Sequence, residues 1–122
     1  MVYWQIWRFF MRITIVGSGY VGLVTGTCLA EIGHHITCVD NDKSKVDKLK
    51  RGVIPIYEPG LESLVKRNTE HDRLEFTTDI SSALKDAVTC FIAVGTPQDE
   101  DGSADLRHVR AVAKSIGESL NN

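Results

Sequence analysis

The run Arg12-Ile-Thr-Ile-Val16 leads directly into Gly17-Ser-Gly-Tyr-Val-Gly22, and this stretch decides the fold. The first part is a short β-branched run that ends at a glycine, as a buried strand does. The glycines then recur as Gly17-x-Gly19-x-x-Gly22, and apolar residues continue beyond them at helical spacing. A strand, a glycine-rich turn and a helix in this order are the context in which such a pattern binds a dinucleotide. A structural strand-to-helix turn is the alternative.

Each loop position has a physical role in the dinucleotide interpretation. Gly17 permits the tight turn, Gly19 lets a pyrophosphate approach the backbone, and Gly22 lets the helix pack closely on the strand. The backbone N–H groups of Tyr20 and Val21 are expected to face the phosphates, because a helix N-terminus offers free donors and a partial positive charge.

Asp40 follows the second apolar run, His35-Ile-Thr-Cys-Val39, and lies 21 residues after Gly19. A carboxylate there can accept hydrogen bonds from the adenosine ribose, and it repels a 2′-phosphate. No arginine occurs in the next three residues, so the sequence predicts NAD rather than NADP. Two alternatives stay open at this point. Asp40 can simply cap the next helix, or the loop and the acid can belong to an S-adenosylmethionine-dependent methyltransferase.

Lys45 and Thr96 are further candidates for cofactor contacts. Lys45 can reach back toward the ribose or phosphate from the next helix, although a solvated lysine on a helix surface is the alternative. Thr96 belongs to Gly95-Thr-Pro97, which follows the fourth predicted strand. Ligands bind at the carboxyl edge of open α/β sheets, where this hydroxyl is expected. A simple strand exit is the alternative for Thr96.

Outward from the loop, strands and helices alternate along the chain. We expect strands at 12–16, 35–39, 74–77 and 87–94, helices at 20–32, 43–51, 60–68 and 104–120, and a short helix that ends at about 86. Apolar strands that alternate with helices indicate a parallel sheet covered on both faces. The predicted fold class is therefore α/β, a doubly wound parallel sheet of the Rossmann type. Such folds usually have six strands, so this one is expected to be truncated after about four.

The sequence also predicts local details of these elements. Asp42 should cap the helix at 43–51, Asp79 or Ser81 the short helix that ends at about 86, and Pro59 should occupy the first turn of the helix at 60–68. Val21 is expected on the buried side of the first helix, and the fourth strand is interpreted as fully apolar. The cysteines are interpreted as core residues, because buried thiols are poor nucleophiles; they are Cys28, Cys38 and Cys90.

Composition excludes several classes of protein. The 122 residues suit one domain, and 14 basic against 16 acidic residues give no surface for nucleic acid. The longest apolar runs are too short to span a membrane. Three cysteines without a CxxC pair argue against a disulfide framework, and so for a cytoplasmic location. The acidic loop Asp99-Glu-Asp101 lacks partners at ligand spacing, so no metal site is predicted.

Residues 1–10, MVYWQIWRFF, differ from the rest and hold five of the nine aromatic residues. We interpret them as an upstream extension of a domain at 11–122, and the alternative is an apolar arm that packs on a partner. Self-association through these aromatics, or through an unpaired sheet edge, would give a homo-oligomer.

Several motifs together resemble the UDP-glucose/GDP-mannose dehydrogenase family. They are the run Ile13 to Val24, Asp40 followed by Lys45, the segment Pro55-Ile-Tyr-Glu-Pro-Gly-Leu61, and Val94-Gly-Thr-Pro97 leading to Asp105-Leu106. These motifs cover 11 to about 120. The segment Pro55 to Leu61 discriminates best, since a generic dinucleotide fold does not require it, and it is most similar to the UDP-glucose members of the family.

The resemblance implies a two-step, NAD-dependent oxidation of the C6 alcohol of UDP-glucose to UDP-glucuronate by the full-length parent. It also implies that the glycine loop with Val21, then Asp40, Lys45 and Thr96, contact the cofactor. The family's thiol nucleophile, lysine and aspartate belong to later segments, so no catalytic residue is assigned. We expect residues 11–122 to be an incomplete NAD-binding domain that has no turnover without the catalytic domain. A stand-alone, non-enzymatic dinucleotide-binding module and another nucleotide-sugar dehydrogenase of the same family are the alternatives.

Overall fold

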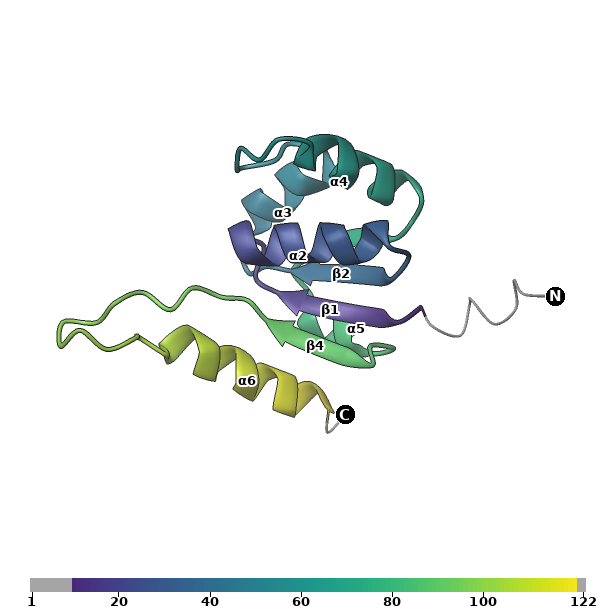
Figure 1. Ribbon diagram of the computed structural model, residues 1–122. Coiled ribbons are helices and arrows are strands. Elements are labelled where there is room, and N and C mark those ends of the chain that lie inside the picture. Colours follow the sequence, from purple (N-terminus) through teal and green to yellow (C-terminus); the bar gives the residue numbers. More distant parts are fainter. Residues whose placement is uncertain (1–9, 121–122) are drawn as a thin grey trace.

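Four strands form one parallel sheet in the order β3-β2-β1-β4. The structure is a computed structural model, and it describes residues 10–120. Its elements are β1 (Arg12–Val16), α2 (Tyr20–Glu31), β2 (His35–Val39), α3 (Lys43–Lys50), α4 (Leu61–Glu70), β3 (Leu74–Thr77), α5 (Ile80–Leu84), β4 (Thr89–Ile92) and α6 (Arg107–Leu120). Helices α2, α3 and α4 lie on one side of the sheet, and α5 and α6 lie on the other (Figure 1). The predicted doubly wound α/β fold is confirmed.

The two faces of the sheet differ in polarity. On the α2 side, Ile13, Ile15, Ile36 and Cys38 are each at most 3% exposed and form the core with buried residues of the helices. Helix α2 approaches closely because a Cβ at Gly26 would lie 3.0 Å from the Cys38 sulfur. The α5 side instead carries a polar row in register, Thr14–Thr37–Glu75. The apolar core therefore lies mainly between the sheet and helices α2, α3 and α4.

The predicted caps Asp42 of α3 and Asp79 of α5 are confirmed. Asp42 accepts a hydrogen bond of 3.1 Å from the Lys45 backbone N–H, and Asp79 accepts one of 3.1 Å from Ser82. The expectation for Pro59 is wrong. Helix α4 begins at Leu61 after Gly60, whose φ of +82° is left-handed, so Pro59 precedes the cap instead of occupying the first turn.

The predicted buried side of α2 is partly wrong. Val21 is 66% exposed and Cys28 is also exposed, whereas Gly22, Leu23, Gly26, Thr27 and Ala30 are buried. The glycines explain the difference. Gly22 and Gly26 lie on the side of the helix that faces the sheet. Because glycine has no side chain, this side permits the closest approach.

The fourth strand lies at one edge of the described sheet. Strand β4 is shorter than expected and pairs with β1 alone, so Phe91 is 46% exposed. Of the cysteines, Cys38 is buried as predicted, whereas Cys90 in β4 is only partly buried.

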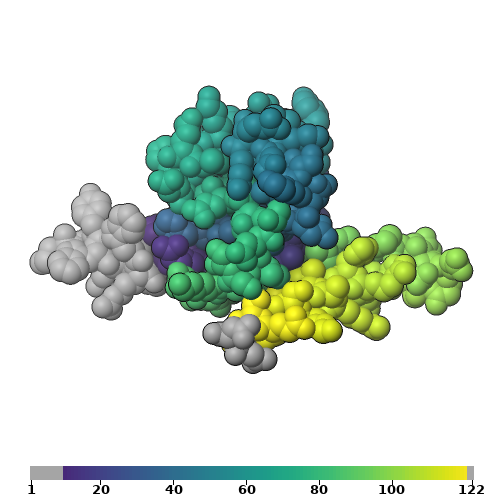
Figure 2. All heavy atoms as spheres, turned by 180° about the vertical axis from the view of Figure 1, so that it is seen from behind, coloured from purple at the N-terminus to yellow at the C-terminus, as the bar shows by residue number. Residues whose placement is uncertain are grey.

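Helix α6 begins three residues later than expected. Asp105, two residues before its first residue, accepts a hydrogen bond of 3.0 Å from the Arg107 backbone N–H. The segment between β4 and α6 extends away from the sheet before it returns, and α6 lies along the bottom of the molecule in both views (Figures 1 and 2).

The extension predicted at residues 1–10 lies, apart from Phe10, outside the described residues. The Phe10 ring packs edge-on against His34, with ring centroids 6.0 Å apart. Within residues 10–120, no helix is long and apolar enough to cross a membrane.

Candidate functional site

A cavity with a volume of about 560 Å³ lies at the carboxyl ends of the strands. The segments that follow all four strands contribute to it, and α6 forms one wall. The strand order reverses here, because β1 pairs with β2 along one edge and with β4 along its other edge. In open α/β sheets ligands bind at this position. The lining residues are Val16, Gly17, Ser18, Gly19, Val39, Asp40, Asn41, Lys45, Thr78, Ile80, Ala93, Val94, Gly95, Pro97, His108, Ala111, Val112 and Ser115.

The glycine loop between β1 and α2 forms the floor of this cavity. Gly17 has a φ of +110°, and a Cβ there would lie 2.5 Å from the carbonyl oxygen of Ala93, so the position requires glycine. A Cβ at Gly22 would overlap the carbonyl oxygen of Gly17. In contrast, a Cβ at Gly19 would meet nothing within 4 Å. The chain therefore leaves open space over the backbone at Gly19, where a bound group can approach it.

The N-terminus of α2 faces this open space with free donors. The first intrahelical hydrogen bond joins the Leu23 N–H to the Gly19 carbonyl at 2.9 Å. The N–H groups of Tyr20, Val21 and Gly22 consequently have no partner earlier in the helix, as in the first turn of any helix. These groups and the helix dipole favour an anion at this position.

Asp40 lies at the end of β2 and is held by several donors. Its Oδ2 accepts hydrogen bonds of 2.6 Å from the Ser18 hydroxyl and 3.1 Å from the Ser18 N–H, and its Oδ1 accepts one of 3.0 Å from the Asp42 N–H. The Lys45 ammonium is 3.4 Å from Oδ2. Burial acts to raise the pKa of Asp40, but these hydrogen bonds and the lysine outweigh it and lower the pKa. The carboxylate is therefore charged and fixed at the cavity wall.

Four of the predicted site residues line this one cavity: Gly17, Gly19, Asp40 and Lys45. Gly22 lies beneath it as the packing glycine. Tyr20 and Val21 do not line it, and their backbone N–H groups lie in the first turn of α2, next to the lining residue Gly19. Thr96 is exposed, and its neighbours Gly95 and Pro97 line the cavity instead. The Tyr20 hydroxyl points elsewhere and donates a hydrogen bond of 2.7 Å to Glu58.

Several lining residues were missed in the sequence analysis. Ser18 is 1% exposed and carries the hydrogen bonds to Asp40. Its position between two loop glycines was the available signal. Thr78 follows β3, and the same rule that selected Asp40 could have found it. His108 comes from α6, and no local pattern in the sequence indicates that this helix forms a wall of the cavity.

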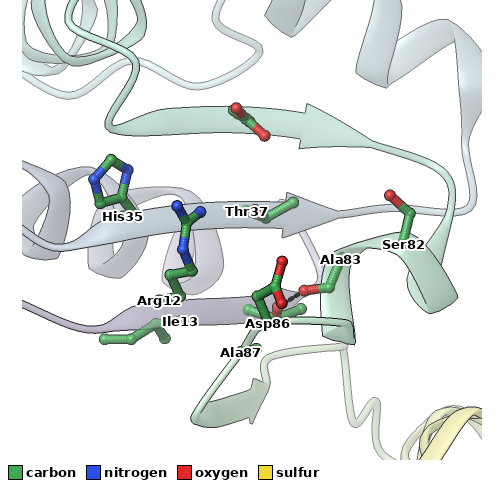
Figure 3. Close-up of a pocket in the computed structure, with 10 residues that line it drawn as sticks. Arg12, Ile13, His35, Thr37, Ser82, Ala83, Asp86 and Ala87 are labelled. Atoms are coloured by element: carbon green, nitrogen blue, oxygen red, sulfur yellow. Dashed lines mark hydrogen bonds between the residues drawn. The ribbon is translucent and has the colours of Figure 1, made fainter.

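A second, smaller cavity of about 200 Å³ lies at the polar face of the sheet beside α5. Figure 3 shows His35 at one side of it, Arg12 and Asp86 near the middle, and Ser82 at the other side. Thr14 closes its floor with a hydrogen bond of 2.6 Å to the Ala83 carbonyl. None of the predicted site residues lines this cavity. Among residues 10–120, no group of three or more His, Cys, Asp or Glu side chains could hold a metal ion.

Two parts of the larger cavity can bind different groups of a ligand. A carboxylate can accept hydrogen bonds from a sugar diol, and the glycine loop can hold a diphosphate against the start of α2. The open space at Gly19 and the negative charge at Asp40 thus fit a dinucleotide whose adenosine ribose carries free hydroxyls.

Residues 11–122 match the family described as the UDP-glucose/GDP-mannose dehydrogenase family, NAD binding domain. The chain belongs to this family. Its described residues thus form the NAD-binding domain that characterises this family, and NAD is the cofactor of the domain. The methyltransferase alternative for the loop and Asp40 is thereby overturned.

Curated relatives in this family are similar over most of the chain. The chain is 56% identical over 110 residues to the UDP-glucose 6-dehydrogenase TuaD of Bacillus subtilis and 53% identical over 110 residues to the UDP-glucose 6-dehydrogenase of Pseudomonas aeruginosa. Each alignment covers 90% of this chain and 24% of the relative. The chain thus spans about a quarter of the length of these relatives.

Solved structures of the family have the same fold. A GDP-mannose dehydrogenase from Pseudomonas aeruginosa superposes with a TM-score of 0.87 at 42% identity, over 90% of this chain and 25% of that one. A UDP-glucose dehydrogenase from Pyrobaculum islandicum also gives 0.87, at 40% identity over 91% of this chain and 26% of that one.

Proposed function

We propose that this chain supplies the cofactor site of a UDP-glucose 6-dehydrogenase, which oxidises the C6 alcohol of UDP-glucose to UDP-glucuronate with NAD. The observation that carries the proposal is the cavity that joins Asp40, Lys45 and the open backbone at Gly19. The 56% and 53% identities to UDP-glucose 6-dehydrogenases support this substrate within the family.

The residues of the chain bind and orient the cofactor. Asp40 accepts hydrogen bonds from the adenosine ribose, and its charge disfavours a 2′-phosphate. The backbone at Gly19 and the N–H groups of Tyr20 and Val21 hold the pyrophosphate. Lys45 offsets the phosphate charge from α3. Bound NAD supplies the hydride acceptor for the alcohol carbon of the substrate.

Thr96 is assigned a weaker role in this proposal. Its exposed side chain does not line the cavity, whereas its neighbours Gly95 and Pro97 do. We therefore propose that Thr96 acts mainly as part of this loop at the carboxyl end of β4. A larger fraction of the binding energy then comes from Asp40 and the glycine loop than from Thr96.

The chemical step requires groups beyond this cavity. Cys28 is exposed on α2, Cys38 is buried, and Cys90 belongs to β4, and none of the three lines the cavity. We therefore assign the nucleophile and the sugar-nucleotide pocket to another part of the parent protein. The chain by itself should bind NAD and leave UDP-glucose unchanged.

A chimeric enzyme tests the proposal. Residues 11–122 replace the matching segment of the Bacillus subtilis UDP-glucose 6-dehydrogenase TuaD, whose remaining part supplies the sugar-nucleotide pocket, and NADH production from UDP-glucose is followed. We expect UDP-glucose oxidation with NAD that is lost in an Asp40→Ala chimera. A folded chimera that binds no NAD would contradict the proposal. A control chimera with Asp47→Ala, a half-buried residue outside the cavity, should keep its activity.

A further inference from the structure

We propose that Ser18 is a positioning residue that holds the Asp40 carboxylate in the orientation which selects the cofactor. The inference deepens the proposed function and rests on it for the role of Asp40. Ser18 is the residue between the first two glycines of the loop, and it contacts Asp40 through both its side chain and its backbone.

The geometry of this contact is specific. The Ser18 hydroxyl donates at 2.6 Å and the Ser18 N–H at 3.1 Å, and both bonds end on the same oxygen, Oδ2. The Asp42 N–H holds the other oxygen at 3.0 Å. The carboxylate plane is consequently fixed from both sides, whereas an aspartate at a strand end normally has free rotation about χ2.

Burial adds to the strength of the interaction. Ser18 is 1% exposed, and the Asp40 side chain is only 14% exposed. Hydrogen bonds to a charged group are stronger than those between neutral groups, and they are screened less away from water. The hydroxyl of Ser18 therefore contributes to keeping Asp40 both ionised and aimed.

This contact links two parts of the dinucleotide site. Ser18 lies in the loop that faces the diphosphate, and Asp40 lies at the position that faces the ribose. When the hydroxyl is removed, Asp40 can turn away from the ribose and also repels a 2′-phosphate less. We therefore expect Ser18 to control the preference for NADH over NADPH as well as the affinity for NADH.

The cavity that contains Asp40 is lined by two other titratable residues of the described chain. Lys45 of α3 is 3.4 Å from the carboxylate, and His108 of α6 lines the same cavity. Both are unchanged by a substitution at Ser18. A difference between the pKa of Asp40 in wild type and in a Ser18 variant consequently reports the loss of the hydroxyl.

The test uses Ser18→Ala and the size-matched Ser18→Cys, which fills the buried space but donates weakly. Titration of the Asp40 carboxyl carbon by NMR should show a higher pKa in both variants than in the wild type. NADH affinity, measured by calorimetry, should fall roughly tenfold, and the NADH preference over NADPH should fall with it. In an Asp40→Ala background, Ser18→Ala should leave NADH affinity unchanged, because its effect acts through the carboxylate.

Each alternative outcome has a distinct meaning. An unchanged Asp40 pKa, or an equal loss of NADH affinity with and without Asp40, would overturn the positioning role. Failure of the wild type to bind NADH would instead overturn the proposed function, and the pKa comparison would still decide the role of Ser18. Unfolding of Ser18→Ala alone would leave the Ser18→Cys comparison to decide.

Discussion

Gly22 lies so close to Gly17 that a Cβ on Gly22 would overlap the carbonyl oxygen of Gly17. The two glycines thus fix how near α2 comes to the end of β1, and this distance sets the floor of the cavity. Gly19, between them, has no such constraint, because a Cβ there would meet nothing within 4 Å. The loop therefore separates a packing glycine from a glycine that leaves space for a ligand.

Alanine substitutions at Gly22 and Gly19 should affect different properties, namely stability and NADH binding. Gly22→Ala should lower the free energy of unfolding by about 3 kcal/mol, because the blocking atom is backbone and cannot move cheaply. Gly19→Ala should change it by less than about 1 kcal/mol, yet weaken NADH binding at least roughly tenfold. Urea denaturation and calorimetry measure the two effects. A Gly19→Ala variant with wild-type NADH affinity would show that no ligand approaches the backbone there.

Lys45 and Lys43 offer a matched comparison of two lysines on α3. Lys45 lines the cavity beside Asp40, whereas Lys43 pairs with Asp47 on the exposed surface. Lys45→Ala should weaken NADH binding several-fold, and the difference from wild type should shrink at high salt because charge attraction is screened. Lys43→Ala should leave NADH affinity unchanged. Equal effects of the two substitutions would indicate a general charge effect and not a contact.

Asn68 connects α4 to α2 from a fully buried position. Its amide donates hydrogen bonds of 2.7 Å to Glu31 and 2.8 Å to the Leu64 carbonyl, and its oxygen accepts one of 2.9 Å from Arg73. Asn68→Ala should lower the free energy of unfolding by about 1–3 kcal/mol, because these partners lose their bonds. The neighbouring Thr69→Val should be neutral or stabilising, since the buried Thr69 hydroxyl is without a partner among the described residues.

The same contact predicts a dependence of stability on pH. The hydrogen bond from Asn68 is the main cause that lowers the pKa of Glu31 below its usual value. A lowered carboxyl pKa adds stability above the unfolded-state pKa, and this stability is lost as pH falls through the folded-state value. Acidification below about pH 4.5 should therefore destabilise the wild type more than Asn68→Ala. Parallel loss in both proteins would contradict this assignment.

Cys28 and Cys38 should differ in reactivity. Burial raises the pKa of the Cys38 thiol to about 12, whereas Cys28 is exposed on α2. Iodoacetamide at about pH 8 should modify Cys28 in the native protein and reach Cys38 only on unfolding. Mass mapping of the labelled sites measures this order. Labelling of Cys38 as fast as Cys28 would show that the β1–β2 core opens readily.

The sequence predicted those parts of the structure that depend on nearby residues. The β-branched run before Gly17, the capping carboxylates Asp42 and Asp79, and the acid at the end of β2 each have a local physical signature. Their positions follow from strand, turn and helix chemistry within a few residues. The order of strands and helices then leads to the parallel sheet, because parallel strands require crossover connections.

Tertiary contacts determined what the sequence did not predict. Val21 is apolar yet exposed, because the glycine side of α2 packs on the sheet. Strand β4 is largely apolar yet partly exposed to solvent, because β1 is its single neighbour in the described sheet. His108 lines the cavity because the segment after β4 brings α6 back across the sheet, and no spacing within α6 shows this. The hydrogen bonds of Ser18 likewise depend on a residue 22 positions away.

The most direct test of the account is a calorimetric comparison of NADH and NADPH binding to the wild type and to Asp40→Ala. We expect the wild type to bind NADH and to bind NADPH much more weakly, because a fixed carboxylate accepts from a ribose diol and repels a phosphate. Asp40→Ala should lose roughly 10–100-fold in NADH affinity and no longer discriminate against NADPH. Equal binding of both cofactors by the wild type, or an unchanged NADH affinity in Asp40→Ala, would contradict the assignment of this cavity as the NAD site.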